Sequence, residues 1–429
     1  MCGPVGRASR PLVNVIYAAK SSPQRPRDSA MVLPDCLSQT ADDGSMAIAN
    51  DQNPEVLEHP QSIADLELEA RRDSQPHDDT DDDLEPTATG TPQVSQPHAS
   101  GSHPTPALSP TSSSSDSPDD EDDFFYDMTE DILRPLRVKG FSPEDGRWTT
   151  KYPSCDTPVF ALRLVSWNVD FVTPDPAGRM ARILHHLQDW VLMDCPKPSC
   201  ILLQELTEES FEALLENTWV QEHFVITPPN TKRWQASYGL ATLVSRHARV
   251  RNAQMLQFHR TTMGRGAIFV DVEMFVPGSM GETRIVRIAN THLESLPEGE
   301  RSRPAQLRAI AGLLRQKTVT GGGVVGGDMN MIGPADQDIH IRAGLVDGCV
   351  NPTLDDYTWG WQPPTWFPPG RLDRFFFRED GIEWRATQVI GRDVKTQGTG
   401  QWVSDHYGLT STIHLAAATK NTCPECTRH

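Results

Sequence analysis

Four short polar stretches, each next to an apolar run, constrain the fold of this chain more than any other feature. They are Ser166-Trp167-Asn168, Leu203-Gln204-Glu205, Gly327-Asp328-Met329-Asn330 and Ser404-Asp405-His406. The first three follow segments with the composition of buried strands, at 160–165, 200–203 and 324–325. Because polar residues at the ends of neighbouring strands meet at one sheet edge, we expect these side chains to converge on a rigidly held site.

The negative charge of the chain is concentrated in its first part. Residues 1–150 hold 28 Asp and Glu against 11 Lys and Arg, which gives −17 of the formal net charge of −19. Acidic runs with few aromatic residues cannot bury enough apolar surface to offset the entropy lost on ordering. We therefore predict a disordered N-terminal region over 1–132, a catalytic domain over 133–418 and a short flexible tail over 419–429. Protein partners of unknown identity are expected to bind the acidic region, where either 62–72 or 124–138 could fold on contact with a partner.

Composition also excludes several classes of protein. The folded part is close to neutral, which argues against electrostatic coating of nucleic acid through many phosphate contacts. The 8 cysteines are too scattered for a disulfide framework and fit a reducing compartment. No apolar stretch reaches the roughly 20 residues of a membrane span, so we expect no membrane contact. A monomer is the default expectation. The first 27 residues contain five basic and no acidic residues, which leaves mitochondrial targeting as an alternative.

Beyond residue 135 the sequence alternates between strand and helix patterns. Helical spacing of apolar residues predicts helices over 179–192 and 305–315, and Thr207 has the character of an N-cap for a helix that ends near Asn217. Strands are predicted at 160–169, 200–206, 238–245, 266–275, 283–290, 323–326, 373–378, 384–390 and 407–414. Turn signals such as Pro277-Gly278 join neighbouring strands as hairpins, so the sheets are mixed. The predicted fold class is α/β, with two packed mixed sheets and helices outside them.

The residue types at the strand ends suit the hydrolysis of a phosphoester. Glu205 offers a hard oxygen ligand to Mg²⁺, and Asp328 can orient or deprotonate an attacking water. Asn168 and Asn330 can donate amide N–H groups to phosphate oxygens. Each motif alone has a simpler explanation, since a helix start attracts acids such as Glu205, and Gly-Asp-x-Asn is a common turn. Their joint occurrence in this order favours catalysis.

His406 is the predicted stabiliser of the transition state. A histidine held by a carboxylate stays cationic and can stabilise a pentacoordinate oxyanion. Asp373 is the predicted partner, because it stands at the start of a run that leads into a buried strand. Alone, a histidine beside an aspartate is more often structural than catalytic, and only the company of the other motifs favours the catalytic role.

The order of the four motifs resembles the endonuclease/exonuclease/phosphatase superfamily of Mg²⁺-dependent phosphoesterases. Within it, three further stretches resemble the 5′-specific tyrosyl-DNA phosphodiesterases: Thr291-His292-Leu293-Glu294-Ser295, Tyr357-Thr358-Trp359, and Leu372-Asp373-Arg374-Phe375-Phe376-Phe377. The resemblance covers about residues 160–415. One departure is Pro297, which stands where that group has an arginine and so removes a phosphate contact.

The resemblance implies a four-layered α/β/β/α sandwich that uses Mg²⁺, with Mn²⁺ as a substitute. The implied reaction is hydrolysis of the phosphotyrosyl bond between a DNA 5′ end and a trapped topoisomerase. This DNA-repair step favours a nuclear location over the mitochondrion or cytoplasm. An abasic-site endonuclease, a poly(A) deadenylase and a non-catalytic scaffold that binds DNA ends remain as alternatives, because the shared core alone does not separate them.

The resemblance also implies roles for single residues. The implied metal ligand is Glu205, and whether a second ion joins through Asp405 stays open. The implied catalytic residues are Asp328 for water, Asn168 and Asn330 for the phosphate, and His406 with Asp373 for the transition state. The implied DNA contacts are His292 and Ser295, Trp359 as a stacking surface, and Arg265 at a phosphate.

Overall fold

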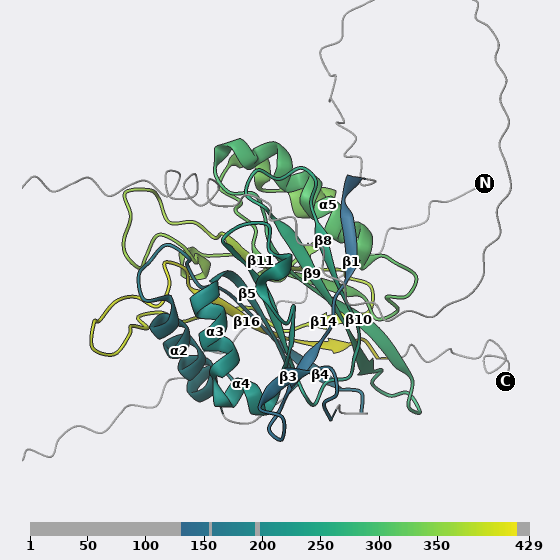
Figure 1. The fold of residues 1–429 in the computed structure, drawn as a ribbon. Helices are drawn as coiled ribbons and strands as arrows, with labels where there is room; N and C mark the ends of the chain where they lie inside the picture. The colour runs from purple at the N-terminus through teal and green to yellow at the C-terminus, as the bar shows by residue number, and fades with distance from the viewer. Residues whose placement is uncertain (1–129, 154–156, 194–197, 418–429) are drawn as a thin grey trace, which may run out of the picture. The chain divides into compact units, whose positions relative to one another are not determined.

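The computed structural model describes residues 130–153, 157–193 and 198–417. These residues form two β-sheets with helices on their outer faces (Figure 1). The prediction for 1–132 falls almost wholly outside the described residues, and the prediction for 419–429 falls entirely outside them. Within the described ranges, no helix is long and apolar enough to cross a membrane.

The first sheet contains seven strands. Its order is β1 (Ile132–Pro135), β8 (Val250–Gln257), β9 (Gly266–Phe275), β10 (Thr283–His292), β11 (Gly323–Asp328), β13 (Asp373–Phe377) and β12 (Val346–Asp347). β10 and β11 run parallel, whereas the other neighbours are antiparallel. The predicted turn at Pro277-Gly278 joins β9 to β10, and Gly278 adopts a φ of 74°, which glycine tolerates without strain.

The second sheet contains nine strands. Its order is β14 (Ile382–Trp384), β16 (Gly408–Leu415), β4 (Ala161–Asn168), β5 (Ser199–Thr207), β7 (Tyr238–Ser245), β6 (Phe224–Thr227), β2 (Lys139–Ser142) and β3 (Arg147–Thr149), with β15 (Gln388–Ile390) paired to β16. β4 and β5 run parallel; β4 ends in Asn168, and Glu205 lies two residues before the end of β5. Both sheets are therefore mixed, as predicted.

Three clusters of buried apolar residues separate four layers. One cluster lies between the sheets and includes Leu164, Val270 and Phe375. A second joins the second sheet to α2 (Pro176–His186), α3 (Glu208–Glu216) and α4 (Thr218–His223). A third joins the first sheet to α5 (Ser302–Leu314) and α6 (Ile339–Arg342). In Figure 1, α2, α3 and α4 lie together on one side and α5 on the other, so the predicted α/β/β/α sandwich is confirmed.

Strand register brings the polar strand ends together. Asn168 lies opposite Gln204 in the β4–β5 pair, and Asp328 lies between His292 and Asp373 in the first sheet. A buried amide contact joins the two sheets close to these ends, because Gln204 Nε2 donates to Asn290 Oδ1 at 2.8 Å. The ends of β4, β5, β10 and β11 are thereby held at one end of the sandwich.

The helix predicted over 179–192 begins earlier and changes type. It starts at Pro176, because the Asp175 side chain accepts a hydrogen bond from Gly178 N and proline suits the first turn. Its last part, Leu187–Val191, is a π-helix, in which Leu192 N donates to Leu187 O at 2.8 Å. The earlier start brings Arg179 inside the helix.

The other predicted helices differ by a few residues at their ends. The helix predicted over 305–315 starts at Ser302, since Pro304 is tolerated in a first turn whose N–H groups have no partner inside the helix. The predicted N-cap at Thr207 is confirmed, because its side chain accepts from Ser210 N. Asn217 ends α3 and caps α4 through Val220 N.

The continuous strand predicted over 384–390 is wrong. The structure has two short strands, β14 and β15, which pair with opposite ends of β16. Trp384 Nε1 and Thr387 Oγ1 both donate to Gly348 O, each at 2.9 Å. Residues three apart in a regular strand point to opposite faces, so these two contacts require a break between them.

The prediction overlooked six strands: β1, β2, β3, β6, β8 and β12. Most are short or lie at sheet edges, where the apolar alternation is weak. β1 lies within 124–138, one of the segments predicted to bind a partner, but there Ile132–Pro135 pairs with β8. These four residues are an edge strand of the domain rather than a free segment.

A buried ion pair anchors α5 and yields a stability prediction. Arg303 and Asp336 have fully buried side chains, and Arg303 also donates to Leu296 O at 2.8 Å.

Arg303→Met is expected to lower the free energy of unfolding by about 3–5 kcal/mol, because Asp336 would remain as an uncompensated buried charge. Urea unfolding measures this. Arg308→Met, on the exposed face of the same helix, should change it by less than about 0.5 kcal/mol. Equal effects of the two substitutions would contradict the assignment.

Candidate functional site

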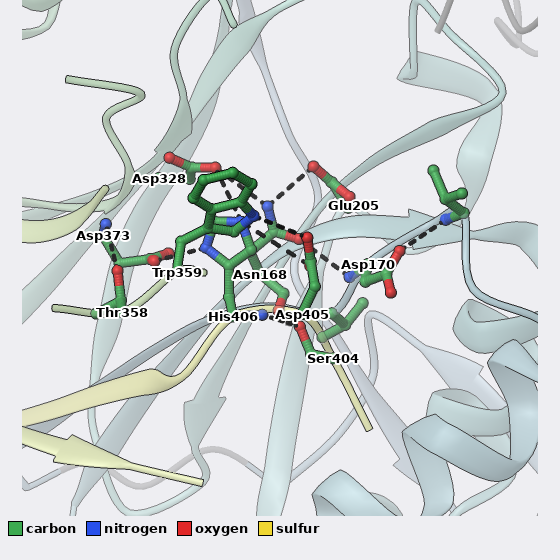
Figure 2. A network of polar contacts seen from close by, with 12 residues as sticks. Asn168, Asp170, Glu205, Asp328, Thr358, Trp359, Asp373, Ser404, Asp405 and His406 are labelled. Carbon is green, nitrogen blue, oxygen red and sulfur yellow. Dashed lines mark hydrogen bonds and ion pairs between the residues drawn. The ribbon is translucent and has the colours of Figure 1, made fainter. Parts of the chain in front are cut away.

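The centre of the site is an amide held between carboxylates from both sheets (Figure 2). Asn168 Nδ2 donates to Glu205 Oε1 at 2.9 Å and to Asp328 Oδ2 at 3.2 Å. Asn168 Oδ1 accepts from Asp170 N at 3.0 Å. Three residues that lie far apart in the sequence thus meet, as the strand-end pattern predicts. In this state both N–H bonds of the Asn168 amide are directed at carboxylates.

Glu205 is presented by an irregularity in β5. Its φ of 58° lies in the left-handed region, and the pairing of β5 with β7 shifts between Leu203 and Leu206. This conformation costs a non-glycine residue about 1–3 kcal/mol, and such strain gathers at functional sites. The Glu205 side chain is only 12% exposed, and its Oε2 accepts from Phe171 N at 3.1 Å. The distortion therefore aims the carboxylate into the site.

His406 and Asp373 form the predicted pair. His406 Nδ1 lies 2.7 Å from Asp373 Oδ2, and both side chains are buried. Asp373 is fixed in turn by its backbone N–H, which donates to Thr358 Oγ1 at 3.1 Å. His406 Nε2 faces Asp328 Oδ2 at 3.8 Å and Asp405 Oδ1 at 3.9 Å. One nitrogen is thus anchored while the other points into the acidic cluster (Figure 2).

Neighbouring carboxylates keep His406 protonated against the effect of burial. Burial alone would lower its pKa, but the nearby carboxylates of Asp373, Asp405 and Asp328 outweigh burial and raise the pKa well above its usual value. Both ring nitrogens then carry a proton. His406 is therefore a cation and a hydrogen-bond donor at this site.

The pKa values of three carboxyl groups at the site are raised. Burial, with the charges of Asp405 and Asp170, raises the pKa of Glu205 to about 8. Burial also raises the pKa of Asp405 to about 6, although His406 opposes this, and it raises the pKa of Asp328. Burial and, to a lesser extent, mutual repulsion therefore oppose the ionisation of these carboxyl groups.

His292, predicted to contact DNA, lies inside the acidic cluster. Its Nε2 is 3.4 Å from Asp328 Oδ2 and 3.7 Å from Glu205 Oε1. Its Nδ1 is 2.8 Å from Arg265 Nη1, and arginine can only donate, so Nδ1 is an acceptor. Burial and the charge of Arg265 lower the pKa of His292 well below its usual value. The neutral ring therefore carries its proton on Nε2, which makes Nε2 a donor rather than a metal ligand.

Arg265 and Ser295 lie behind His292. Arg265 is 3% exposed, and its Nη2 donates to Ser295 Oγ at 2.7 Å. The terminal nitrogens of Arg265 are thus engaged by His292 and Ser295. The predicted phosphate contact of Arg265 and the DNA contacts of His292 and Ser295 stay predictions.

Asn330 and Trp359 also lie at the site. Asn330 has a φ of 47°, its backbone N–H donates to Asp328 Oδ1 at 2.9 Å, and its Nδ2 donates to Leu293 O at 3.1 Å. Trp359 Nε1 donates to Asp405 Oδ2 at 3.0 Å, so its indole N–H points toward the acids. Phosphate binding by Asn330 and base stacking by Trp359 stay predictions.

Asp170 is a member of the site that the sequence pattern did not single out. It is 6% exposed, has a φ of 62°, and accepts from Val172 N and Thr173 N at 2.9 and 3.1 Å. Its charge raises the pKa of both Glu205 and Asp405. The signal was present, because Asp170 comes two residues after the end of β4.

The donor set fits a hard divalent cation. Ligand atoms of Glu205, His292 and Asp328 lie within 4.8 Å of one another, as do those of Asp328, Asp373 and His406. Because each histidine Nε2 carries a proton, only the carboxylate oxygens can be metal ligands, and sets of oxygen ligands suit Mg²⁺ and Mn²⁺. A cation among these acids would also offset the repulsion that, after burial, raises the pKa values of Glu205 and Asp405.

Comparison with curated protein sequences gave no match. Among solved structures, TDP2 from D. rerio complexed with single strand DNA product is 20% identical, with a TM-score of 0.48 and coverage of 59% of this chain and 99% of that chain. TDP2 from C. elegans is 20% identical, with a TM-score of 0.47 and coverage of 60% and 76%. The human Nocturnin catalytic domain with bound sulfate anion is 15% identical, with a TM-score of 0.42 and coverage of 60% and 96%. Such values carry no information on substrate.

The sequence also matches a protein family directly. Residues 165–406 match the Endonuclease/Exonuclease/phosphatase family. This stretch begins within β4, just before Asn168, and ends at His406, so it contains every acid and histidine of the site. It spans more than half of the chain. The chain therefore belongs to the Endonuclease/Exonuclease/phosphatase family.

Proposed function

We propose that this protein is a Mg²⁺-dependent phosphodiesterase that removes tyrosine from a DNA 5′-phosphate, and so releases trapped topoisomerase in DNA repair. Family membership supports the coarser part, hydrolysis of phosphoesters with a divalent metal. One observation supports the proposed substrate, the 5′-phosphotyrosyl bond. The three stretches that resemble 5′-tyrosyl-DNA phosphodiesterases contribute His292, Trp359 and Asp373, which surround Asp328 and Asp405. A nuclear location is proposed with this substrate.

The metal would be held by Glu205, with Asp405 as a candidate second ligand. When bound, Mg²⁺ supplies positive charge to a phosphate oxygen and offsets the charge of the acids. Glu205 is already aimed by the strained backbone at φ 58° and by the Phe171 N–H. The protein thus presents a ligand that needs little rearrangement on binding.

Asp328 and His406 supply the rest of the chemistry. Asp328 orients a water and accepts its proton as the oxygen attacks phosphorus, and the bond from phosphorus to the tyrosine oxygen breaks. The product is a DNA 5′-phosphate, and the tyrosine leaves as a phenolate that takes up a proton from solvent. Its conjugate acid has a pKa of about 10, so it leaves readily. Protonated His406 stabilises the oxyanion, and His292 Nε2–H is a second donor.

Removal of the Glu205 charge tests the metal ligand. Glu205→Gln is expected to reduce Mg²⁺-dependent hydrolysis of a 5′-phosphotyrosyl oligonucleotide by at least about 10²–10³-fold without unfolding the domain. Glu209→Gln is the matched control, since Glu209 is an exposed acid in the first turn of α3. Full activity of Glu205→Gln would remove it from the mechanism.

The same gel tests the substrate. An abasic duplex and an oligo(A) are incubated beside the phosphotyrosyl oligonucleotide with wild-type protein and Mg²⁺. We expect cleavage of the phosphotyrosyl bond. Turnover of the abasic duplex alone, or of oligo(A) alone, would replace the proposed substrate, and turnover of none would favour a scaffold.

Asp328→Asn separates catalysis from binding. The amide keeps the shape of the side chain but cannot accept the proton of water, so hydrolysis is expected to stop while DNA affinity is retained. Fluorescence anisotropy with a labelled oligonucleotide measures affinity. Loss of DNA binding together with activity would instead make Asp328 a structural residue.

The raised pKa of Glu205 makes Mg²⁺ binding depend on pH. Protons and Mg²⁺ compete for this carboxylate below its pKa of about 8, so affinity for Mg²⁺ should rise about tenfold per pH unit between roughly pH 6 and 8 and level off above. Below about pH 6, the carboxyl of Asp405 should steepen the dependence. Calorimetry in buffers of different ionisation enthalpy counts the protons released. A flat affinity from pH 6 to 8 would show that Glu205 is already ionised.

A further inference from the structure

Arg179 of α2 is a buried arginine that contacts two loops of the site. Its side chain is 1% exposed, and all its N–H groups are directed at backbone carbonyls. Nε donates to Pro174 O at 3.1 Å, Nη1 donates to Val403 O at 2.9 Å, and Nη2 donates to Thr173 O at 2.8 Å. The remaining two bonds run from Nη1 to Val169 O and from Nη2 to Asp170 O.

The first of these loops, residues 169–174, holds Glu205. It carries Asp170, and Phe171 N in it donates to Glu205 Oε2 at 3.1 Å. Four of the five carbonyls bound by Arg179 belong to this loop. A shift of the loop would therefore move the backbone donor of Glu205 and the carboxylate of Asp170 together.

The second loop carries Asp405 and His406. Val403, bound by Arg179, directly precedes Ser404, whose Oγ donates to Asn168 O at 2.6 Å. His406 N donates to Ser404 Oγ at 3.0 Å. One guanidinium thus joins the backbone of Val169 and Asp170 with that of Val403, two residues before Asp405, although the two loops are far apart in the sequence.

Charge gives Arg179 a second effect on the acids. Its Nη1 lies 3.9 Å from Asp170 Oδ2, and the charges of Asp170, Asp405 and Glu205 all favour its charged form. Burial opposes them and lowers its pKa, but arginine stays protonated over the pH range of proteins. A permanent cation therefore sits behind the acidic cluster, on the side of the protein interior.

We propose that Arg179 is a positioning residue that sets the affinity of the site for Mg²⁺. It does so by fixing the loops at 169–174 and 403–406 relative to each other before the ion binds. The inference rests on the proposed metal-dependent function. If both loops are already ordered, metal binding does not have to supply the entropic cost of ordering them. Lysine could keep the charge but not the planar fork that binds five carbonyls at once.

A purely structural role would give a different result. Arg287 offers a matched control, because it is 2% exposed and its Nε and Nη2 donate to Asp271 at 2.6 and 2.8 Å, while its other hydrogen bonds go to Leu313 and Gln316. Arg179→Lys and Arg287→Lys should both lower stability. If Arg179 acts through the two loops, only Arg179→Lys should also lower the affinity for Mg²⁺.

The test is a calorimetric titration of the full chain with Mg²⁺. We expect the Kd for Mg²⁺ to rise at least tenfold in Arg179→Lys and to stay unchanged in Arg287→Lys. Hydrogen exchange provides a second readout, since amides of the two loops should exchange faster in metal-free Arg179→Lys than in wild type and regain protection at saturating Mg²⁺. Arg179→Gln, which keeps fewer donors and no charge, replaces the lysine variant if that variant does not fold.

The outcomes separate this inference from the proposed function. Absence of Mg²⁺ binding by the wild-type protein would overturn the metal-dependent function itself. Equal Kd values for wild type and the Arg179 variants would overturn only the role of Arg179. Equal weakening by Arg179→Lys and Arg287→Lys would also overturn it, because the effect would then follow general stability.

Discussion

The site depends on one contact that crosses between the two sheets, the Asn168 amide held between Glu205 and Asp328. Asn168 ends β4 and Glu205 lies near the end of the parallel strand β5 in the second sheet, and Asp328 ends β11 of the first. The contact exists only when both sheets pack in the observed register. The buried contact between Gln204 and Asn290 secures that packing, because leaving either amide unpaired would cost desolvation energy.

Packing several acids together is unfavourable, and the surroundings show how the protein offsets this. Protonated His406 faces Asp328, and Arg179 lies behind Asp170. Backbone N–H groups support Glu205 and Asp328 from loops whose φ angles are positive. Strain and repulsion of this kind lower stability, and proteins accept them where a reaction needs charge held in advance.

Much of the fold and part of the site could be predicted from local patterns. Apolar runs followed by Asn168, Glu205 and Asp328 identified β4, β5 and β11, since a strand end is readable over a few residues. The Asp373 partner of His406 was inferred in the same way and is found at 2.7 Å. Short edge strands such as β1 and β12 were overlooked, because their apolar alternation is weak and their pairing depends on distant neighbours.

The sequence by itself determined which chemical groups stand at the strand ends, and therefore that a phosphoester site could form. The tertiary structure alone decided how those groups are charged and held. The proton of His292 lies on Nε2 because Arg265, distant in sequence, donates to Nδ1. Arg179 joins two loops through backbone carbonyls, which every residue possesses and which therefore leave no trace in the sequence. Such contacts depend on position in space, and only the folded chain creates them.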